Sequence, residues 1–211
     1  EARRTSNHPL LHYQEGWIHY HAHQWDKAVP LFERVIKQFP EDKSVVRRCR
    51  LSLSNIYVQQ GDTRKGEQVL EVIFAENPED ISVNNDLGYL YADQGKKLEQ
   101  AEKMIRKALK AEPDNAAYLD SMGWVLFKIG KFDEALEFLT KASDGRDGED
   151  PTILEHLGDC LQKLKQKKPA IENWKKALEL ARKEKWPDKK LIERISKKLK
   201  DAGESVKPPK K

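Results

Sequence analysis

A regular spacing of small residues constrains this chain more than any other feature of its sequence. Ser54, Gly88, Gly123 and Gly158 follow one another at steps of 34, 35 and 35 residues, and Gly16 precedes them by the same step plus a four-residue insertion. After each anchor a second small residue follows at twelve or thirteen positions and a large apolar residue at sixteen or seventeen. A fixed period of this length predicts a repeat architecture, in which each unit buries its apolar surface only by stacking on its neighbours.

Each repeat unit is expected to form two helices. In the fourth unit, apolar residues recur at three- and four-residue steps from Leu119 to Ile129, and a second such stripe runs from Phe132 to Ala142 beyond Gly130. This period is that of an amphipathic helix rather than of a strand. The sequence therefore predicts an all-α fold. The high content of charged residues, 35%, suits such a stack because it has much surface per residue.

Helix start signals lie between the units. Asp42, Asp80 and Asn115 each follow a proline by two residues and stand where the next apolar stripe begins, and Asp150-Pro151 forms a further start signal. Short polar side chains accept hydrogen bonds from the first free backbone N–H groups of a helix, and proline suits the first helical position. We expect new helices to begin at these four points.

Together these residues resemble the tetratricopeptide repeat (TPR) family, and in particular its bacterial members. The resemblance rests on Leu157-Gly158, on the segment from Leu87 to Tyr91 and on the later Ala and Pro positions, and Ser54 and Gly66 depart from the usual pattern. It implies a right-handed α-solenoid of five helix-turn-helix units, with the first helix of each unit lining a concave face. The expected ranges are 1–8 for a lead-in, 9–184 for the array (9–42, 47–80, 81–115, 116–150 and 151–184), 185–203 for a capping helix and 204–211 for a disordered basic tail.

The net charge of +4 is an average over two unlike parts. Residues 1–162 hold 21 Lys and Arg against 28 Asp and Glu, whereas residues 163–211 hold 18 against 7. We therefore expect an acidic array that ends in a basic helix and tail. A basic end can meet an anionic partner, but it is more often a solvated surface.

No motif for catalysis or for a cofactor is present. The chain has no glycine-rich phosphate loop, no nucleophile elbow and no HExxH zinc motif. Its two cysteines, Cys49 and Cys160, lie 111 residues apart and predict neither a disulfide framework nor a cysteine zinc site. We expect no enzyme activity, no cofactor and, for want of a long apolar stretch, no transmembrane insertion.

Two segments invite a metal interpretation. His8, His12, His19 and His23 follow spacings of four, seven and four, and histidine pairs at such spacings bind zinc or nickel. No carboxylate or thiolate accompanies them, and packing explains His12 and His19 equally well. The acidic loop from Asp144 to Asp150 lacks the ligand order of a calcium loop, so we interpret it as a solvated connector.

If the resemblance holds, positions on the first helix of each unit face the concave side, and they define a candidate partner-binding groove. Rigid aromatic side chains beside hydrogen-bonding amides suit peptide capture, although the same aromatics could instead fill the space between helices. The acidic residues among them favour a neutral-to-basic partner. The lysine-and-asparagine carboxylate clamp of the family's chaperone-binding members is not expected, because Tyr13 and Trp17 occupy two of its positions. The candidate groove residues are Tyr13, Trp17, Tyr20, Asn55, Asn85, Tyr89, Asp120, Trp124, Phe127, Glu155 and Asp159.

We therefore expect a non-enzymatic scaffold that binds an extended peptide segment of a partner protein, as a monomer or weak homodimer. Two alternatives remain open: an adaptor whose basic C-terminal region contacts nucleic acid or an anionic surface, and a self-association module. Because the chain begins with Glu1 and has methionine only at positions 104 and 122, we interpret it as a fragment. Its compartment, cytoplasm or periplasm, stays open.

Overall fold

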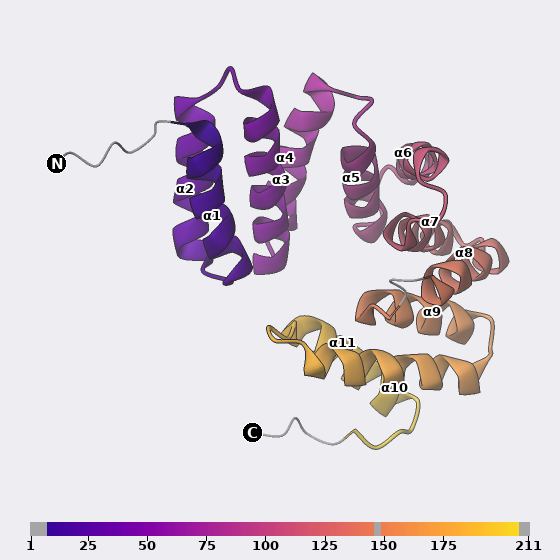
Figure 1. Ribbon diagram of the computed structural model, residues 1–211. Helices are drawn as coiled ribbons and strands as arrows, with labels where there is room; N and C mark the ends of the chain where they lie inside the picture. Colours follow the sequence, from indigo (N-terminus) through magenta and orange to yellow (C-terminus); the bar gives the residue numbers. More distant parts are fainter. Residues whose placement is uncertain (1–7, 146–148, 207–211) are drawn as a thin grey trace. The chain divides into compact units, whose positions relative to one another are not determined.

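The computed structural model describes residues 8–145 and 149–206, and this part of the chain consists of helices and short connections (Figure 1). The predicted all-α fold of the α-solenoid class is confirmed. The bounds of the helices are α1 Pro9–His21, α2 Trp25–Gln38, α3 Lys43–Gln60, α4 Thr63–Glu76, α5 Ile81–Asp93, α6 Leu98–Ala111, α7 Ala116–Ile129, α8 Phe132–Asp144, α9 Pro151–Lys163, α10 Lys167–Lys183 and α11 Lys189–Asp201.

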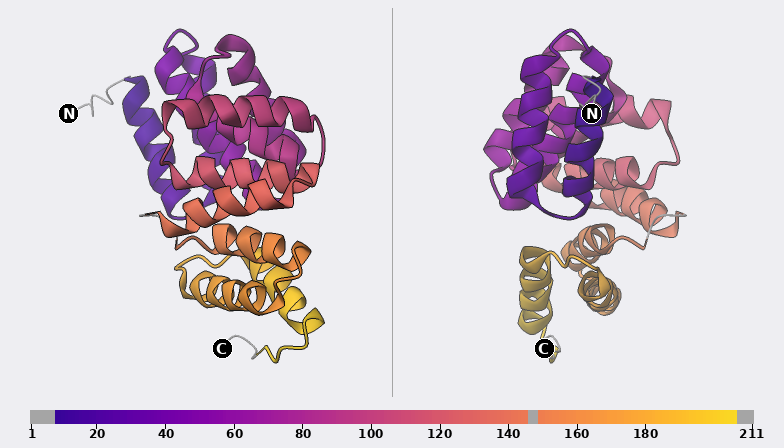
Figure 2. Two further views of the ribbon diagram at one scale, coloured as in Figure 1. Left: turned by 90° about the vertical axis from the view of Figure 1, so that its right-hand side faces the viewer. Right: turned by 60° about the vertical axis from the view of Figure 1, so that its left-hand side comes forward.

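Two compact units make up the chain, residues 1–83 and residues 84–211, and each is described by itself. In the first unit, α1 packs on α2 and α3 packs on α4 (Figure 1). In the second unit, α7 packs on α8 and α9 packs on α10, and α11 then packs on α10 at the C-terminal end (Figure 2). Three ranges lie outside the described residues. They are residues 1–7 of the predicted lead-in, residues 146–148 of the predicted connector 144–150 and residues 207–211 of the predicted tail.

The predicted helix starts are confirmed by hydrogen bonds. Asp42 accepts from the backbone N–H of Val45 at 3.1 Å, and Asp80 accepts from Val83 at 3.2 Å. Asn115 and Asp150 accept at the starts of α7 and α9 in the same way. These bonds satisfy backbone donors that have no partner within the helix.

Close helix contact explains the glycine anchors. A Cβ atom on Gly158 of α9 would lie 2.4 Å from two atoms of the Trp174 indole of α10, and one on Gly123 of α7 would lie 2.5 Å from Cγ of Leu139 of α8. The large apolar residue that follows each of these anchors by sixteen positions therefore occupies the space that the missing side chain leaves. This is the physical basis of the repeat pattern.

The departure from the pattern in the second repeat has a compensating contact. Ser54 of α3 stands where the other repeats have glycine, and its hydroxyl donates to the Gly66 carbonyl of α4 at 2.8 Å. A Cβ on Gly66 would lie 2.6 Å from Val58 and 2.9 Å from the Ser54 carbonyl oxygen. The small residue has thus moved from the first helix of the pair to the second, and the helices still approach closely.

Candidate functional site

The candidate groove residues of the first unit lie on α1 and α3. Trp17 is 46% exposed and contacts the ring of His21, with centroids 3.9 Å apart. Tyr20 contacts Trp25 at 5.5 Å, Tyr13 packs against Phe32 at 5.7 Å, and Asn55 accepts a hydrogen bond from Gln59 at 3.0 Å. The unit thus carries an exposed aromatic surface at Trp17.

In the second unit, several candidate residues gather around His156, which is not among the predicted groove residues. The His156 ring is 3% exposed and stacks on the Trp124 indole at a centroid distance of 3.8 Å and an angle of 12°. Trp124 stacks in turn on Phe127 at 5.0 Å, and the Tyr89 ring lies 6.2 Å from His156. Trp124 is 7% exposed, so its main contacts are within the fold.

Asp120 of α7 and His156 of α9 form a buried pair. Nδ1 of His156 lies 2.9 Å and 3.1 Å from the two carboxylate oxygens of Asp120. Burial opposes protonation of the imidazole, but the Asp120 carboxylate, together with Glu155 and Asp159, outweighs it and raises the pKa of His156. The Asp120 carboxylate thus favours the protonated form of His156 between α7 and α9 relative to a histidine in water.

This pair predicts a pH-dependent stability. A group whose pKa is raised in the folded state stabilises the fold fully below its unfolded pKa, about 6.5 for histidine, and this contribution is lost as the pH rises through the folded pKa. Urea unfolding measured from pH 6 upward should therefore show the free energy of unfolding of the second unit falling, with a smaller slope in His156→Gln. The variant assigns the change to His156, because the chain has five other histidines. Equal slopes for the two proteins would contradict the assignment.

The acidic candidate residues of α9 are paired with cations of α11. Glu155 is 1% exposed and accepts from Arg194 at 2.6 Å and 2.5 Å and from Lys198 at 2.6 Å. Asp159 accepts from Lys198 at 2.6 Å and from the Trp174 indole N–H at 3.0 Å. Arg194 and Lys198 outweigh the effect of burial and lower the pKa of Glu155.

These pairs correct one expectation from the sequence. An acidic groove was expected from Asp86, Asp93, Asp120, Glu155 and Asp159. In the structure Glu155 and Asp159 form ion pairs with cations of α11, Asp120 pairs with the His156 imidazole, and Asp86 accepts a hydrogen bond from Asn85. Asp93, likewise, accepts from the Trp124 indole N–H at 3.2 Å and lies 4.0 Å from Nζ of Lys128. The predicted groove lay within the five repeat units, which end at residue 184, so it did not include the side chains of α11.

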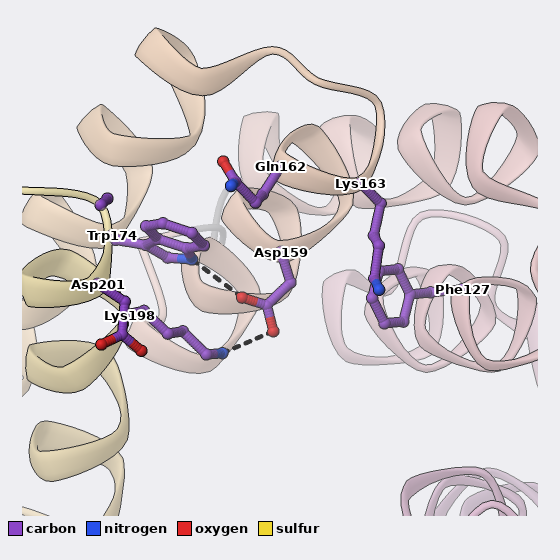
Figure 3. Close-up of a pocket in the computed structure, with 8 residues that line it drawn as sticks. Phe127, Asp159, Gln162, Lys163, Trp174, Lys198 and Asp201 are labelled. Carbon is purple, nitrogen blue, oxygen red and sulfur yellow. Dashed lines mark hydrogen bonds and ion pairs between the residues drawn. The ribbon is translucent and has the colours of Figure 1, made fainter.

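A pocket of about 300 Å³ opens beside these ion pairs (Figure 3). Phe127 and Lys163 stand on one side of it, and Trp174, Lys198 and Asp201 stand on the other, with Asp159 and Gln162 between them (Figure 3). Ala202, at the end of α11, completes the lining. Of the candidate groove residues, Phe127 and Asp159 reach this pocket, whereas Asp120, Trp124 and Glu155 lie behind it in the packed contacts between helices.

The candidate metal ligands do not come together. His8 caps α1, His12 stacks on Phe39 at 5.7 Å, and His19 is hydrogen-bonded to Gln24 at 2.7 Å. His23 contacts the Trp25 ring at 4.6 Å. Residues 8–145 and 149–206 contain no cluster of three or more His, Cys, Asp or Glu side chains arranged to hold a metal ion.

None of the described helices combines the length and the apolar character needed to cross a membrane. The two cysteines are buried and unpaired with each other, and burial raises the pKa of Cys49 to about 12 and that of Cys160 to about 11. Both thiols are therefore protonated at neutral pH, which makes them poor nucleophiles.

Comparison with known proteins supports the repeat assignment. A tetratricopeptide repeat model matches residues 19–85 and 57–124, and a model of subunit 3 of the anaphase-promoting complex (cyclosome) matches residues 94–177. A TPR repeat-containing protein of Pseudomonas aeruginosa is 32% identical over 136 residues, which are 64% of this chain and 22% of that protein. The type IV pilus assembly protein PilF of the same organism is 30% identical over 140 residues, 64% of this chain and 54% of PilF. The chain thus spans about a fifth and about half of the length of these relatives.

Solved structures show the same fold. MamA MSR-1 is 26% identical to this chain, with a TM-score of 0.57. The match covers 82% of this chain and 95% of the MamA chain. TTC0263, a thermophilic TPR protein of Thermus thermophilus, is 23% identical to this chain, with a TM-score of 0.68. The match covers 91% of this chain and 99% of the TTC0263 chain. The helices are paired, the glycine anchors lie at close helix contacts, and the family model matches residues on both sides of the boundary between the two units. The chain therefore belongs to the tetratricopeptide repeat family.

Proposed function

We propose that this chain is a non-enzymatic interaction module whose second unit captures an extended segment of a partner protein at the pocket between Phe127 and α11. TPR proteins generally act as protein-interaction scaffolds. The observation that carries the proposal is the pocket itself, which combines an accessible aromatic wall with polar side chains from α9 and α11. Partner sites of this kind use one or two aromatic anchors surrounded by polar groups.

Phe127 is the anchor that the geometry favours. It is half-buried, it stacks on Trp124, and it contacts the Phe132 ring at 5.4 Å, so its position is fixed before a partner arrives. Preorganised side chains lose little conformational entropy on binding. Trp124 and Asp120 are poorer choices for mutagenesis, because both are buried and their replacement also disturbs the fold.

Affinity capture with the chain as bait, followed by affinity measurement on a retained protein, tests this proposal. Phe127→Ala should weaken that affinity at least tenfold, which corresponds to about 1.4 kcal/mol. The matched control is Phe138→Ala on α8, which truncates a half-buried phenylalanine that packs against the core away from the pocket. Equal affinities for the wild type and Phe127→Ala would contradict the proposed site.

The alternative of an anionic-surface adaptor receives less support from the described residues. Lys175, Lys176, Lys183 and Lys197 of the basic region each form an ion pair with a nearby carboxylate. Lys176, Arg194 and Lys198 pair with carboxylates outside this region, Glu149, Glu155 and Asp159, which offset part of its excess positive charge. Binding of nucleic acid through this region would weaken steeply as the salt concentration rises. Binding of a partner that does not depend on salt would therefore contradict the adaptor alternative.

A further inference from the structure

Some of the polar side chains that line the pocket already form hydrogen bonds or ion pairs within the protein, and others do not. Both oxygens of Asp159 accept hydrogen bonds, from Trp174 and Lys198, and Asp201 accepts from Lys197 at 2.5 Å. Both carboxylates of the pocket therefore already pair with donors of the protein itself, Asp159 through its two oxygens and Asp201 through Oδ2. A cationic ligand would have to compete with these ion pairs.

Two side chains of the pocket that can donate hydrogen bonds have no partner of this kind. The side chains of Gln162 and Lys163, in the last turn of α9, are exposed and make no hydrogen bond or ion pair with the part of the chain that the structure describes. Lys163 stands on the Phe127 side of the pocket, opposite Lys198 and Asp201 (Figure 3). Although Asp159 lies one helical turn before Lys163, its carboxylate is directed to Lys198 and Trp174.

From this asymmetry we infer that the pocket takes a carboxylate group of the partner segment, with an adjacent apolar side chain against Phe127. An ammonium group and a side-chain amide, both unpaired, complement a carboxylate through charge-assisted hydrogen bonds. The inference rests on the proposed function and reverses the neutral-to-basic partner expected from the sequence, because α11 neutralises the acidic residues on which that expectation depended. The carboxylate comes either from an Asp or Glu side chain or from the C-terminus of the segment.

Three matched peptides distinguish these possibilities. All are N-acetylated: Ser-Gly-Leu-Glu-Leu with a C-terminal amide, Ser-Gly-Leu-Gln-Leu with a free C-terminal carboxylate, and Ser-Gly-Leu-Gln-Leu with a C-terminal amide. Each is titrated into the ¹⁵N-labelled chain while the signals of Gln162, Lys163 and the Trp174 indole N–H are followed. We expect one or both carboxylate peptides to shift these signals and to bind about tenfold more tightly than the neutral peptide.

Lys163→Gln replaces the ammonium group with a neutral polar amide, and it should bring the carboxylate peptides down to the affinity of the neutral one. Lys168→Gln, an exposed lysine on α10 outside the pocket lining, is the matched control and should change nothing. If the neutral peptide binds at these signals as tightly as the others, the carboxylate inference is overturned and the proposed site stands. If none of the peptides shifts these signals at millimolar concentration, both the inference and the proposed site are overturned.

Discussion

Replacing both Arg194 and Lys198 with methionine is expected to lower the free energy of unfolding of the second unit by about 3–5 kcal/mol. The two cations are the ion-pair partners of Glu155, which is 1% exposed, and Lys198 also pairs with Asp159. Their removal leaves a buried carboxylate without a cation, and an uncompensated buried charge is among the most destabilising changes in a protein. Urea unfolding followed by circular dichroism measures the effect.

Two further variants separate this effect from a simple loss of surface charge. Adding Glu155→Leu to the double variant removes the stranded carboxylate and should recover at least half of the lost stability. Lys197→Met with Lys200→Met, on the exposed side of the same helix, should change it by less than about 1 kcal/mol. A double variant as stable as the wild type would show that α11 does not hold these carboxylates.

The ion pairs of Glu155 predict acid sensitivity with a defined sign. The pKa of Glu155 is lowered, so its contribution to stability is present above the unfolded pKa of glutamate, about 4.3, and is lost as the pH falls through the lower folded value. The His156 pair behaves in the opposite direction, since its contribution is lost at high pH. Between these limits both pairs stabilise the contacts of α9 with its neighbours.

Gly158→Ala is expected to destabilise the second unit by about 1–3 kcal/mol, although alanine favours a helix over glycine by about 1 kcal/mol. The added methyl group would lie 2.4 Å from Cδ1 and Nε1 of Trp174. Trp174 is 4% exposed and its indole N–H is bonded to Asp159, so the ring has little freedom to move aside. Thermal or urea unfolding of the single variant gives the magnitude.

A double-mutant cycle identifies the cause of this loss. In a Trp174→Leu background the space beside position 158 is larger, so Gly158→Ala should be markedly less harmful there. The same penalty in both backgrounds would mean that the indole is not what excludes a side chain at position 158. A stabilising Gly158→Ala in the wild-type protein would contradict the close approach of α9 and α10.

The local features of the fold could be predicted because each depends on residues close in sequence. Capping by Asp42, Asn115 and Asp150 needs only a short polar side chain before an apolar stripe, and the structure has these bonds. The alternation of helices follows from the apolar period, and the pairing of Gly158 with Trp174 follows from the recurring offset of sixteen residues. Such features are repeated along the chain, so each copy supports the others.

The side-chain partners across helices could not be predicted in the same way. His156 looks like an ordinary polar residue in the sequence, and its role depends on Asp120 lying 36 positions earlier on a neighbouring helix. Arg194 and Lys198 lie beyond the last complete repeat, so the period assigned them no facing residue. One signal was available. Glu155 and Asp159 are four residues apart, as are Arg194 and Lys198, so each pair shares one face of its helix, and two helix faces of opposite charge can form an ion-pair cluster.

The partner-binding residues remain the least determined part of the candidate site, because the repeat pattern indicates which face a residue occupies but not whether a neighbour already uses it. Trp124 and Phe127 have the same aromatic character in the sequence. In the structure Trp124 is enclosed by His156 and Phe127, whereas Phe127 reaches the pocket. Burial therefore divides the predicted aromatic set into packing residues and candidate anchors.

Site-specific photo-crosslinking tests the central claim, that a partner segment binds at the pocket of the second unit, most directly. A photoreactive amino acid is placed at Gln162, which lines the pocket, and in a separate variant at Lys168, which is also exposed but does not line it. Each is irradiated with a partner retained by affinity capture. The account predicts a crosslinked complex from position 162 that Phe127→Ala abolishes, and none from position 168. Crosslinking from position 168 alone, or crosslinking from position 162 that is unaffected by Phe127→Ala, would contradict it.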